Sequence, residues 1–506
     1  MRLSLITIAT ILFNFSSAKD LKNVLFVIFD DLRPALKCYG DDNAVTPNID
    51  RIARDGIIFK HVYAQQSLCA PSRNSLLTSR RPDTLHLYDF YSYWRTFAGN
   101  FTTLPQYFKE NGYHTKSIGK IFHPGISSNF SDDQPYSWSE PPFHPSTLTY
   151  KNAEVCFSDD EPFVPHKNVV CPVRLSSQPG GTLPDMETTQ EAVKFLRRSS
   201  TGAKPFFLAV GYHKPHLPLK YPKHFDDYHD LHRVVLPDHR SRPPQMPDIA
   251  WNPWTDLRER YDVQKLNLTF PYEQMPDSSA KLIRRSYYAA VTYVDSLLGQ
   301  IIDQLMESSL YEETVIVLLG DHGWALGENG EWSKYNNYES TTRVPLVIRA
   351  PSKSSNMLHF EINEDIVELL DVFPTLAHLA GLPDVPPCED KNKDMLCTEG
   401  KNLFQKNQRK SAYSQYPRPC EHPVSDSDKP KLKDIRYMGY TIRNSRYRYT
   451  EYVRFQNFSP NWSEVAAAEL FDHWINADEY SNIVDLPAYK NVRARLSREL
   501  REQGKH

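Results

Sequence analysis

The chain has 506 residues, including 38 prolines and 19 glycines, and its formal net charge at pH 7 is −3. This charge balance gives no overall attraction to nucleic acid, so any anionic partner must be recognised by a local cluster of cations. The length exceeds that of an ordinary single hydrophobic core and indicates one large domain and a smaller one.

Residues 1–18 have the pattern of a secretory signal peptide. Arg2 precedes an apolar run that reaches Phe15, and small residues follow up to Ala18, where such a leader is cleaved. The alternative interpretation, a buried first strand or helix, is disfavoured because a charge leads the run and Ser-Ser-Ala closes it. No later stretch approaches the roughly 20 consecutive apolar residues of a membrane helix. We therefore expect a mature chain without a membrane span, in an exported or luminal compartment.

The elements that follow the leader begin with a strand and two helices. The continuous apolar run at residues 24–29 predicts a strand that is covered on both faces. Thr46 and Pro47 are typical of the start of a helix, and Gly56 is typical of its end. A further helix is expected to begin at Cys69.

The chain continues to alternate between strands and helices. Residues 102–120 have the order of helix, glycine, strand and loop, and residues 205–216 form a strand that enters a histidine-rich loop. A long helix is predicted over about residues 280–306, and a buried strand over residues 314–320. Strands that alternate with helices predict an α/β domain with a largely parallel sheet.

Charged and imidazole side chains follow several of the predicted strands. In a parallel sheet, functional groups gather beyond the carboxyl ends of the strands. One such strand end could arise by chance, but several indicate a shared pocket. The side chains at these ends are Asp30, Asp31, Lys120, His123, His213, His216, Asp321 and His322.

The last part of the chain has a different pattern. Residues 437–455 alternate in the way that antiparallel strands do. The sequence thus predicts a catalytic α/β domain over residues 19–400 and a smaller α+β domain over residues 401–506.

Three aspartates at two of the strand ends indicate a cation site. Asp30 and Asp31 follow the first strand, and Asp321 follows the strand at residues 314–320. Carboxylates held close together repel one another unless a cation offsets their charge, and oxygen-rich ligand sets suit hard cations such as Ca²⁺ or Mg²⁺. A strand-end turn with a capping aspartate would explain the first pair alone. A second strand end that carries Asp321 and His322 is not explained by that turn, so the metal site is the favoured interpretation.

The chain has seven cysteines, an odd number that leaves at least one unpaired in an oxidising compartment. Two pairs lie at short separation in polar, proline-containing loops, and we expect each pair to form a local disulfide. These pairs are Cys156 with Cys171 and Cys388 with Cys397. Cys38, Cys69 and Cys420 remain. A leftover thiol is usually inert and buried, but Cys69 begins the stretch CAPSR and requires a different explanation.

Five N-glycosylation sequons follow the leader. A single tripeptide of this kind is a weak signal, but a secretory leader makes such sites plausible on exposed loops. The sequon asparagines are Asn100, Asn129, Asn267, Asn457 and Asn461.

The pentapeptide CAPSR, from Cys69 to Arg73, resembles the sulfatase signature C-x-P-S-R. The match is specific because Asp-Asp precedes the pentapeptide and Asp-His follows it, in the order of that family. The resemblance covers nearly the whole mature chain and extends to the iduronate-type sulfatases through GKIFHPGISSN, FFLAVGYHKPHLP and DHGWALGENGEWSKY. It implies an alkaline-phosphatase-like sulfatase fold: a large, mostly parallel sheet flanked by helices, with a smaller C-terminal domain that contains an antiparallel sheet.

The resemblance also implies roles for the candidate residues. In this family a formylglycine-generating enzyme of the secretory pathway oxidises the signature cysteine, here Cys69, to Cα-formylglycine, and Arg73 matches the arginine that steadies this group. The residues that match calcium ligands are Asp30, Asp31, Asp321, His322 and the modified Cys69. Many sulfatases have asparagine at the position of His322, whereas the iduronate-type members have histidine.

Further residues match groups that contact the substrate. Lys120 and His123 match a Lys-x-x-His pair, and His216 and Lys334 match residues that hold the sulfate on the leaving-group side. His213 lies close to His216 in the sequence, but the family pattern favours His216. Trp324 and Tyr335 flank the Asp-His motif and are candidates for the walls of the sugar site.

The chemistry of the family explains the need for a cysteine at this position. The aldehyde hydrates to a gem-diol, and one of its hydroxyls attacks the sulfur while the metal and cationic side chains offset the charge of the sulfate oxygens. The alcohol leaves with a proton from His216 or Lys334. The second hydroxyl loses its proton to His123, which expels sulfate and restores the aldehyde, whereas a serine would stay trapped as a sulfate ester. The start of a helix adds a positive dipole end that faces the anion.

Each supporting residue has an ordinary alternative. Lys120 would be a solvated surface lysine, Arg73 would pair with a surface carboxylate, and the histidines would be hydrogen-bonded in loops. For single residues we would prefer these interpretations. The family order and spacing favour the functional interpretation for the whole set.

The resemblance implies a substrate, the 2-O-sulfate of non-reducing-end L-iduronate 2-sulfate in heparan sulfate and dermatan sulfate. The ring carboxylate requires a further cation, for which Arg443, Arg446 and Arg448 are candidates. An exposed strand face of alternating charge is the other interpretation of these arginines, and the sequence does not separate the two.

The leader, the sequons and the resemblance imply a lysosomal enzyme delivered through the secretory pathway, with secretion as the alternative. Three other functions stay open. The chain could be a related sulfatase for another sulfated sugar or an aryl sulfate, or a non-catalytic glycan-binding secreted protein. A metal-dependent phosphatase is the third, and Cys69 argues against it because that branch generally has serine or threonine as its nucleophile.

Overall fold

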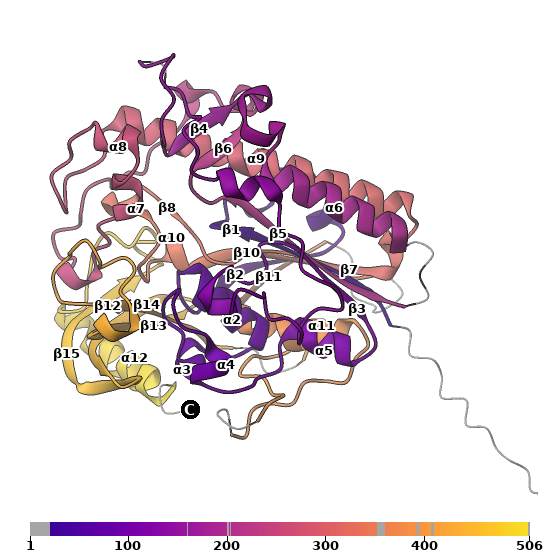
Figure 1. Ribbon diagram of the computed structural model, residues 1–506. Helices are drawn as coiled ribbons and strands as arrows, with labels where there is room; N and C mark the ends of the chain where they lie inside the picture. Colours follow the sequence, from indigo (N-terminus) through magenta and orange to yellow (C-terminus); the bar gives the residue numbers. More distant parts are fainter. Residues whose placement is uncertain are drawn as a thin grey trace, which may run out of the picture.

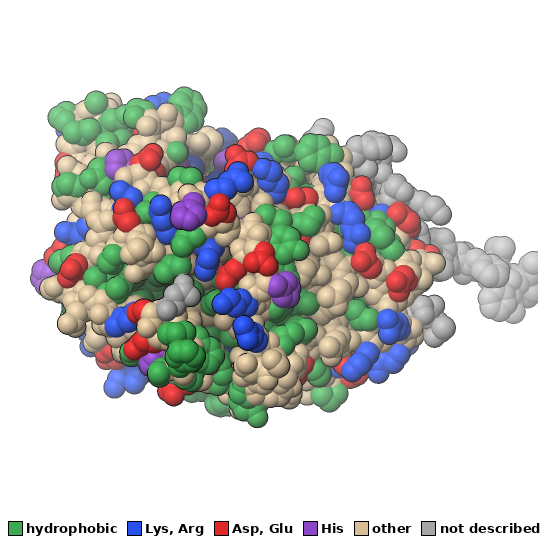
Figure 2. Space-filling model, turned by 90° about the horizontal axis from the view of Figure 1, so that it is seen from above, with side chains coloured by type: hydrophobic (Ala, Val, Ile, Leu, Met, Phe, Trp, Pro, Cys, Tyr) green, Lys and Arg blue, Asp and Glu red, His purple; other side chains and the backbone are tan. Residues whose placement is uncertain are grey.

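The structure is a computed structural model that describes residues 21–158, 160–199, 202, 204–351, 360–390, 394–405 and 409–503. The predicted signal peptide lies outside the described residues. Two large sheets organise the chain (Figure 1). Figure 2 shows acidic and basic side chains interspersed over one face, in keeping with the small net charge. None of the helices in the described ranges has both the length and the apolar composition of a membrane span.

The larger sheet has seven strands in the order β11-β2-β10-β7-β1-β5-β3. Strand β10 runs antiparallel to both of its neighbours, and all other adjacent pairs are parallel. The predicted largely parallel sheet is therefore confirmed. Its strands are β1 (Asn23–Asp30), β2 (Ile57–Tyr63), β3 (His114–Gly119), β5 (Phe206–Pro215), β7 (Thr314–Gly320), β10 (Arg343–Arg349) and β11 (Glu361–Glu368).

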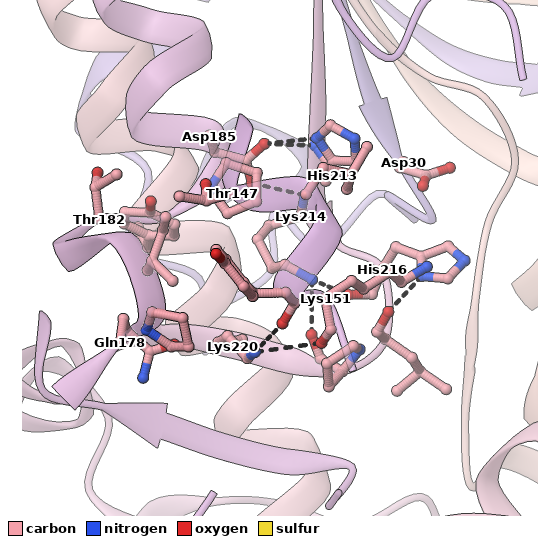
Figure 3. Close-up of a pocket in the computed structure, with 18 residues that line it drawn as sticks. Asp30, Thr147, Lys151, Gln178, Thr182, Asp185, His213, Lys214, His216 and Lys220 are labelled. Carbon is pink, nitrogen blue, oxygen red and sulfur yellow. Dashed lines mark hydrogen bonds and ion pairs between the residues drawn. The ribbon is translucent and has the colours of Figure 1, made fainter. Parts of the chain in front are cut away.

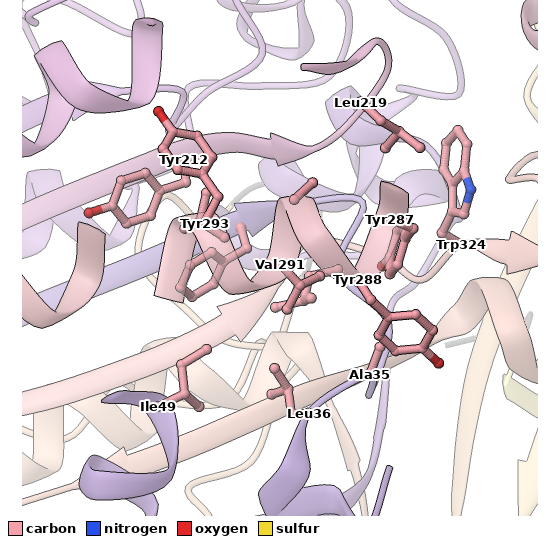
Figure 4. Packing of buried hydrophobic residues seen from close by; sticks show 14 of the residues in the cluster. Ala35, Leu36, Ile49, Tyr212, Leu219, Tyr287, Tyr288, Val291, Tyr293 and Trp324 are labelled. Carbon is pink, nitrogen blue, oxygen red and sulfur yellow. The ribbon is translucent and has the colours of Figure 1, made fainter. Parts of the chain in front are cut away.

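Helices cover both faces of this sheet, and each face has its own hydrophobic core. Alternate side chains of β1 enter the two cores, since successive residues of a strand point to opposite faces. The longer helices with residues in the first core are α1 (Pro47–Arg54), α6 (Pro184–Ser199) and α9 (Asp277–Glu307), and those in the second are α2 (Cys69–Thr78), α5 (Leu104–Glu110) and α11 (Val372–Leu379). Figure 4 shows part of the first core, with Tyr287, Tyr288, Val291 and Tyr293 from α9, Tyr212 from β5 and Ile49 from α1.

The main predicted elements of the α/β part are present. Helix α1 begins at Pro47 and ends before Gly56, α2 begins at Cys69, and α9 extends slightly beyond both predicted ends. The smaller elements are α3 (Pro82–Leu85), α4 (Trp94–Phe97), β4 (Val170–Val173), β6 (Leu219–Pro222), α7 (Thr255–Arg258), α8 (Tyr261–Gln264), β8 (Ala325–Leu326), β9 (Trp332–Ser333) and α10 (Glu339–Thr342).

The second sheet is antiparallel, as the alternation near the C-terminus predicted. Its order is β12-β13-β14-β15, and helix α12 packs on it through Leu496 and Leu500. The sheet is joined to the segment that precedes α2, because Ser414 Oγ donates to the carbonyl oxygen of Ala64 at 2.6 Å. The predicted domain boundary after residue 400 lies between α11 and β12 and stays a prediction. The elements are β12 (Ser411–Arg418), β13 (Tyr437–Asn444), β14 (Tyr447–Gln456), β15 (Ser459–Asp472) and α12 (Lys490–Gln503).

The structure contains both of the expected disulfides, Cys156–Cys171 and Cys388–Cys397. The other three cysteines, Cys38, Cys69 and Cys420, carry free thiols. All five sequon asparagines are exposed, as glycan attachment requires. Their glycosylation stays a prediction.

Candidate active site

The candidate residues meet at the carboxyl ends of neighbouring strands. Strand β1 lies between β7 and β5 in the sheet, and β3 follows β5. Asp30 ends β1 and Asp321 follows β7, so the two carboxylates emerge side by side. A side chain at Gly320 would collide with the carbonyl oxygen of Leu32, so the close approach of these two strand exits requires a glycine.

Cys69 is the first residue of α2 and is buried. Its Sγ lies 3.1 Å from Nζ of Lys334 and 3.4 Å from Nε2 of His322. Burial and the nearby charge of Asp30 raise the pKa of the thiol, although Lys120 and Lys334 oppose this. A thiol with a raised pKa is a poor nucleophile, because the thiolate is the reactive form. The native cysteine is thus ill suited to attack a substrate itself.

Arg73 lies one helical turn after Cys69 and connects the two strand ends. Its Nε donates to Asp321 at 2.8 Å, and its Nη2 donates to Asp30 at 3.1 Å. Nη1 also donates to the carbonyl oxygens of Lys120 and Ile121. The side chain is fully buried, so it fixes the aspartates and the start of the loop after β3 relative to α2.

Two lysines neutralise the first aspartate pair. Lys120 Nζ lies 2.6 Å from Asp30 Oδ2, and Lys334 Nζ lies 2.6 Å from Asp31 Oδ1. Burial would raise the pKa of Asp30, but Lys120 and other cations hold it well below its ordinary value. Burial and the neighbouring Asp30 raise the pKa of Asp31 to about 7, against the effect of Lys334. Each aspartate of the pair thus has its own lysine partner, and their pKa values are driven apart.

The histidines take different positions around this cluster. His216 Nε2 lies 3.9 Å from Asp31 Oδ2. His123 packs against the ring of Phe90, with 4.5 Å between ring centroids, and its buried Nδ1 has no hydrogen-bond partner among the described residues. Burial, assisted by Lys120, lowers the pKa of His123 well below its ordinary value, so its ring is neutral.

His213 has a separate partner. Its Nδ1 lies 3.2 Å from Asp185 Oδ1, and the ring lies between Asp185 and Asp30 (Figure 3). Asp185 also accepts hydrogen bonds from the backbone amides of His213 and Lys214. Nδ1 of His213 is thus engaged by Asp185, and the choice of His216 for the reaction centre stays a prediction.

Two aromatic residues surround Lys334. Its Nζ lies 5.8 Å from the ring centroids of Trp324 and of Tyr335, and both rings are buried. Tyr335 is held by a hydrogen bond of 3.0 Å from its hydroxyl to Asp256. Both residues therefore flank the cluster, and their role as walls of the sugar site stays a prediction.

The donor set fits a divalent cation. Ligand atoms of four side chains all lie within 4.8 Å of one another, and a second group with the same property overlaps it. In addition, Asp31 Oδ2 is buried and has no hydrogen-bond partner among the described residues. A bound cation would supply the missing partner of this oxygen. The first group is Asp30, Cys69, Asp321 and His322, and the second is Asp31, Cys69 and His216.

The three arginines of the C-terminal sheet have structural partners. Arg443 pairs with Glu339 at 2.9 Å, Arg446 with Asp472 at 2.7 Å, and Arg448 with Glu479 at 2.5 Å. These contacts favour the structural interpretation of all three. The expectation that they serve the substrate carboxylate finds no support in their contacts.

Sequence reasoning missed Lys429. This lysine precedes β13 in the chain, and its Nζ lies 5.5 Å from the ring centroid of Tyr335. It therefore brings a cation of the C-terminal part to the aromatic wall of the site. No periodicity or motif distinguishes it from the other lysines of the stretch DKPKLKD.

Comparison with known proteins agrees with this geometry. The sulfatase family model matches residues 22–382, and the model of the N-sulphoglucosamine sulphohydrolase C-terminal region matches residues 327–506. Iduronate 2-sulfatase of Mus musculus is 47% identical over 495 residues, which cover 90% of this chain and 89% of the relative. The Homo sapiens enzyme is also 47% identical, with 90% of each chain covered.

Solved structures show the same fold at lower identity. Phosphonate monoester hydrolase of Agrobacterium radiobacter has a TM-score of 0.71 and 18% identity, with 96% of each chain covered. The structure of BT4656 in complex with D-glucosamine-2-N,6-O-disulfate has a TM-score of 0.63 and 22% identity, covering 96% of this chain and 98% of that one. With a family match over most of its length and two relatives at 47% identity, the chain belongs to the sulfatase family.

Proposed function

We propose that this protein is an exosulfatase that hydrolyses the 2-O-sulfate of non-reducing-end L-iduronate 2-sulfate in heparan sulfate and dermatan sulfate. The identity of 47% with two iduronate 2-sulfatases supports this substrate. One observation carries the reaction type: a buried cysteine at the start of a helix faces both a carboxylate cluster and two lysines. This arrangement suits an anionic ester held beside a metal.

Sulfatases generally use formylglycine and a divalent metal, and the residues here fit both. We assign the formylglycine to Cys69, produced by a formylglycine-generating enzyme during secretion. Once hydrated, it would supply one hydroxyl that attacks the sulfur and a second that allows sulfate to be released. The buried thiol and the helix start, which favours an anion, support this assignment.

We propose Ca²⁺ as the metal, held by Asp30, Asp31, Asp321 and His322 together with the modified Cys69. Carboxylate oxygens are the ligands that hard cations prefer. The bound cation would offset the negative charge of the sulfate oxygens.

The remaining residues would bind the ester and move protons. Lys120 and Lys334 would bind the sulfate oxygens, because their ammonium groups border the cluster on two sides. Arg73 would orient the formylglycine and the aspartates. The neutral ring of His123 is suited to accept a proton. The proton for the leaving alcohol would come from His216 or Lys334.

The sugar ring would lie against the aromatic wall of the site. Trp324 and Tyr335 flank Lys334, and Lys429 lies over the face of Tyr335. We propose that Lys429, in place of the three arginines, pairs with the ring carboxylate.

We further propose that the enzyme reaches the lysosome through the secretory pathway, with secretion as the alternative. The leader pattern and the exposure of all five sequon asparagines support this route. We retain the division into a catalytic domain over residues 19–400 and a C-terminal domain over residues 401–506. Most buried apolar residues of the second sheet form a cluster of their own, joined by Tyr88 of the N-terminal part, which supports this division.

Mass spectrometry of the peptide that contains residues 67–73 tests the proposed chemistry, with protein from a eukaryotic secretory host. We expect an aldehyde or its hydrate at Cys69, and loss of turnover in Cys69→Ser with an unchanged thermal midpoint. A fully active serine variant, or active enzyme that retains the thiol, would refute the mechanism.

A panel of substrates tests the proposed specificity. We expect turnover of iduronate 2-sulfate disaccharides and little turnover of glucosamine sulfates or aryl sulfates. Indifference to the uronate would instead identify a related sulfatase. Glycan binding without turnover, with an unmodified Cys69, would identify a non-catalytic glycan-binding protein.

A further inference from the structure

A pocket next to the candidate active site contains an unusual number of lysines. It begins at Asp30 and His216 and extends between the turn at residues 146–151 and the segment at residues 213–220 (Figure 3). We call it the lysine pocket, defined by the lysines that line it. These are Lys151, Lys214 and Lys220.

Two of these lysines hold the walls of the pocket. Lys214 Nζ donates to the carbonyl oxygens of His216 and Pro218. Lys220 Nζ donates to the carbonyl oxygens of Tyr150 and Lys151. The ammonium groups of Lys214 and Lys220 are therefore both occupied by backbone carbonyl oxygens of the pocket walls.

Lys151 differs from the other two. Among the described residues, its ammonium makes no hydrogen bond and has no carboxylate within ion-pair distance. Of the two aspartates that line the pocket, Asp185 is occupied by His213 and the nearby backbone amides, and Asp30 is paired with Arg73 and Lys120. The positive charge of Lys151 thus has no counterion in the pocket.

A further donor is also unused. Gln178 Nε2 is buried and has no hydrogen-bond partner among the described residues. Gln178 lines the lysine pocket and is 7% exposed. Thr147 also lines the pocket, but its hydroxyl interacts with the carboxylate of Glu187. Buried polar groups are normally satisfied, so an unpartnered donor beside a free ammonium points to a missing acceptor.

The free volume of the pocket limits what this acceptor can be. The pocket holds about 40 Å³, and one water requires roughly 10–15 Å³ by the same measure. The space suits a single small group such as a sulfate or a carboxylate and is too small for a sugar ring. Burial and the cations Lys120 and Lys334 lower the pKa of Lys151 to about 8, so the ammonium remains charged at neutral and acidic pH.

We propose that the lysine pocket is a second anion subsite, which receives one sulfate or carboxylate group of the substrate other than the ester that is cleaved. Lys151 is its ion partner, and Gln178 is its hydrogen-bond donor. The inference rests on the proposed function, because a sulfated uronate in a glycan carries further anions near the reacting one. It gives the enzyme a preference among sulfated glycans that the reaction centre alone does not provide.

Steady-state kinetics on three substrates tests this subsite. The first is an iduronate 2-sulfate disaccharide with a second sulfate on the neighbouring sugar, and the second is the same disaccharide without that sulfate. The third is a 2-sulfated pyranoside in which a hydroxymethyl group replaces the ring carboxylate. Each is measured with the wild type, Lys151→Gln, Lys151→Arg and the control Lys194→Gln, which removes an exposed lysine of α6.

If the second sulfate enters the pocket, the wild type prefers the first substrate to the second by about tenfold in kcat/KM, the worth of one charge-assisted hydrogen bond. In Lys151→Gln this ratio falls to about one, mainly through KM, and Lys151→Arg restores part of it. If the ring carboxylate enters the lysine pocket instead, the same loss separates the second substrate from the third, and the assignment of this carboxylate to Lys429 is wrong. Lys194→Gln keeps the wild-type ratios.

An equal loss of kcat/KM on all three substrates in Lys151→Gln, or no loss on any, would overturn the subsite. Thermal midpoints distinguish these outcomes from misfolding, and Gln178→Leu provides a second variant that leaves the charge in place. If the wild type cleaves none of the iduronate substrates, the proposed function itself fails.

Discussion

Replacement of Arg73 by lysine keeps one positive charge in the site but removes the group that spans both strand ends. The guanidinium donates to Asp321 at 2.8 Å, to Asp30 at 3.1 Å and to the carbonyl oxygen of Ile121 at 3.2 Å. A lysine ammonium is a single point of charge and cannot make these contacts together. Each lost charge-assisted hydrogen bond costs about 1.5–3 kcal/mol, and removal of a whole partner from a buried ion pair costs about 3–5 kcal/mol. We expect Arg73→Lys to lower the free energy of unfolding by about 2–3 kcal/mol.

Urea unfolding measures this loss, with Arg51→Lys as the matched control. Arg51 forms an ion pair of 2.9 Å with Asp303 near the surface, and such pairs contribute at most about 1 kcal/mol. We also expect Arg73→Lys to lose most of its turnover, because the aspartates of the cluster are no longer fixed. If Arg73→Lys were as stable and as active as Arg51→Lys, the argument that this arginine organises the site would be wrong.

Two further predictions concern acidity and the metal. Burial raises the pKa of Glu328, but Arg33 and Arg284 outweigh this effect and lower it to about 2. Glu328 therefore stabilises the fold by about 3 kcal/mol above its unfolded pKa near 4.5, and this contribution is lost as the pH falls toward 2. Thermal melts between pH 7 and pH 2 should show the difference between the wild type and Glu328→Gln shrinking below pH 4.5. Removal of the divalent cation by a chelator should lower the melting point of the wild type, because a ligand at 100 times its Kd contributes about 2.7 kcal/mol, whereas Asp321→Asn should respond little.

Each of these outcomes can contradict its premise. A stability difference for Glu328→Gln that stays constant over the whole pH range would mean that its carboxylate has no lowered pKa in the fold. A melting point of the wild type that is indifferent to the chelator would argue against a bound cation. An unaltered response to the chelator in Asp321→Asn would place the cation elsewhere.

The sequence by itself determined the features that depend on local pattern. The apolar runs before Asp30 and Asp321 predicted two buried strands, and these strands are neighbours in the sheet. A parallel sheet gathers the ends of its strands at one edge, so local pattern and topology together were enough to predict the carboxylate cluster. Cys69 was also identified from the sequence alone. The stretch CAPSR resembles the sulfatase signature, and it lies between the Asp-Asp and Asp-His motifs in the order of that family.

Only the tertiary structure decided which cations are free to meet a substrate. Arg443 and Lys429 lie near one another in the sequence, yet the first is paired with Glu339 and the second lies over Tyr335. Lys151 has no distinguishing pattern at all, and its lack of a counterion appears only when the pocket is assembled. The physical reason is that a long charged side chain takes its partner from groups distant in the sequence. Burial and neighbouring charge, which determine the role of such a residue, are therefore properties of the folded chain.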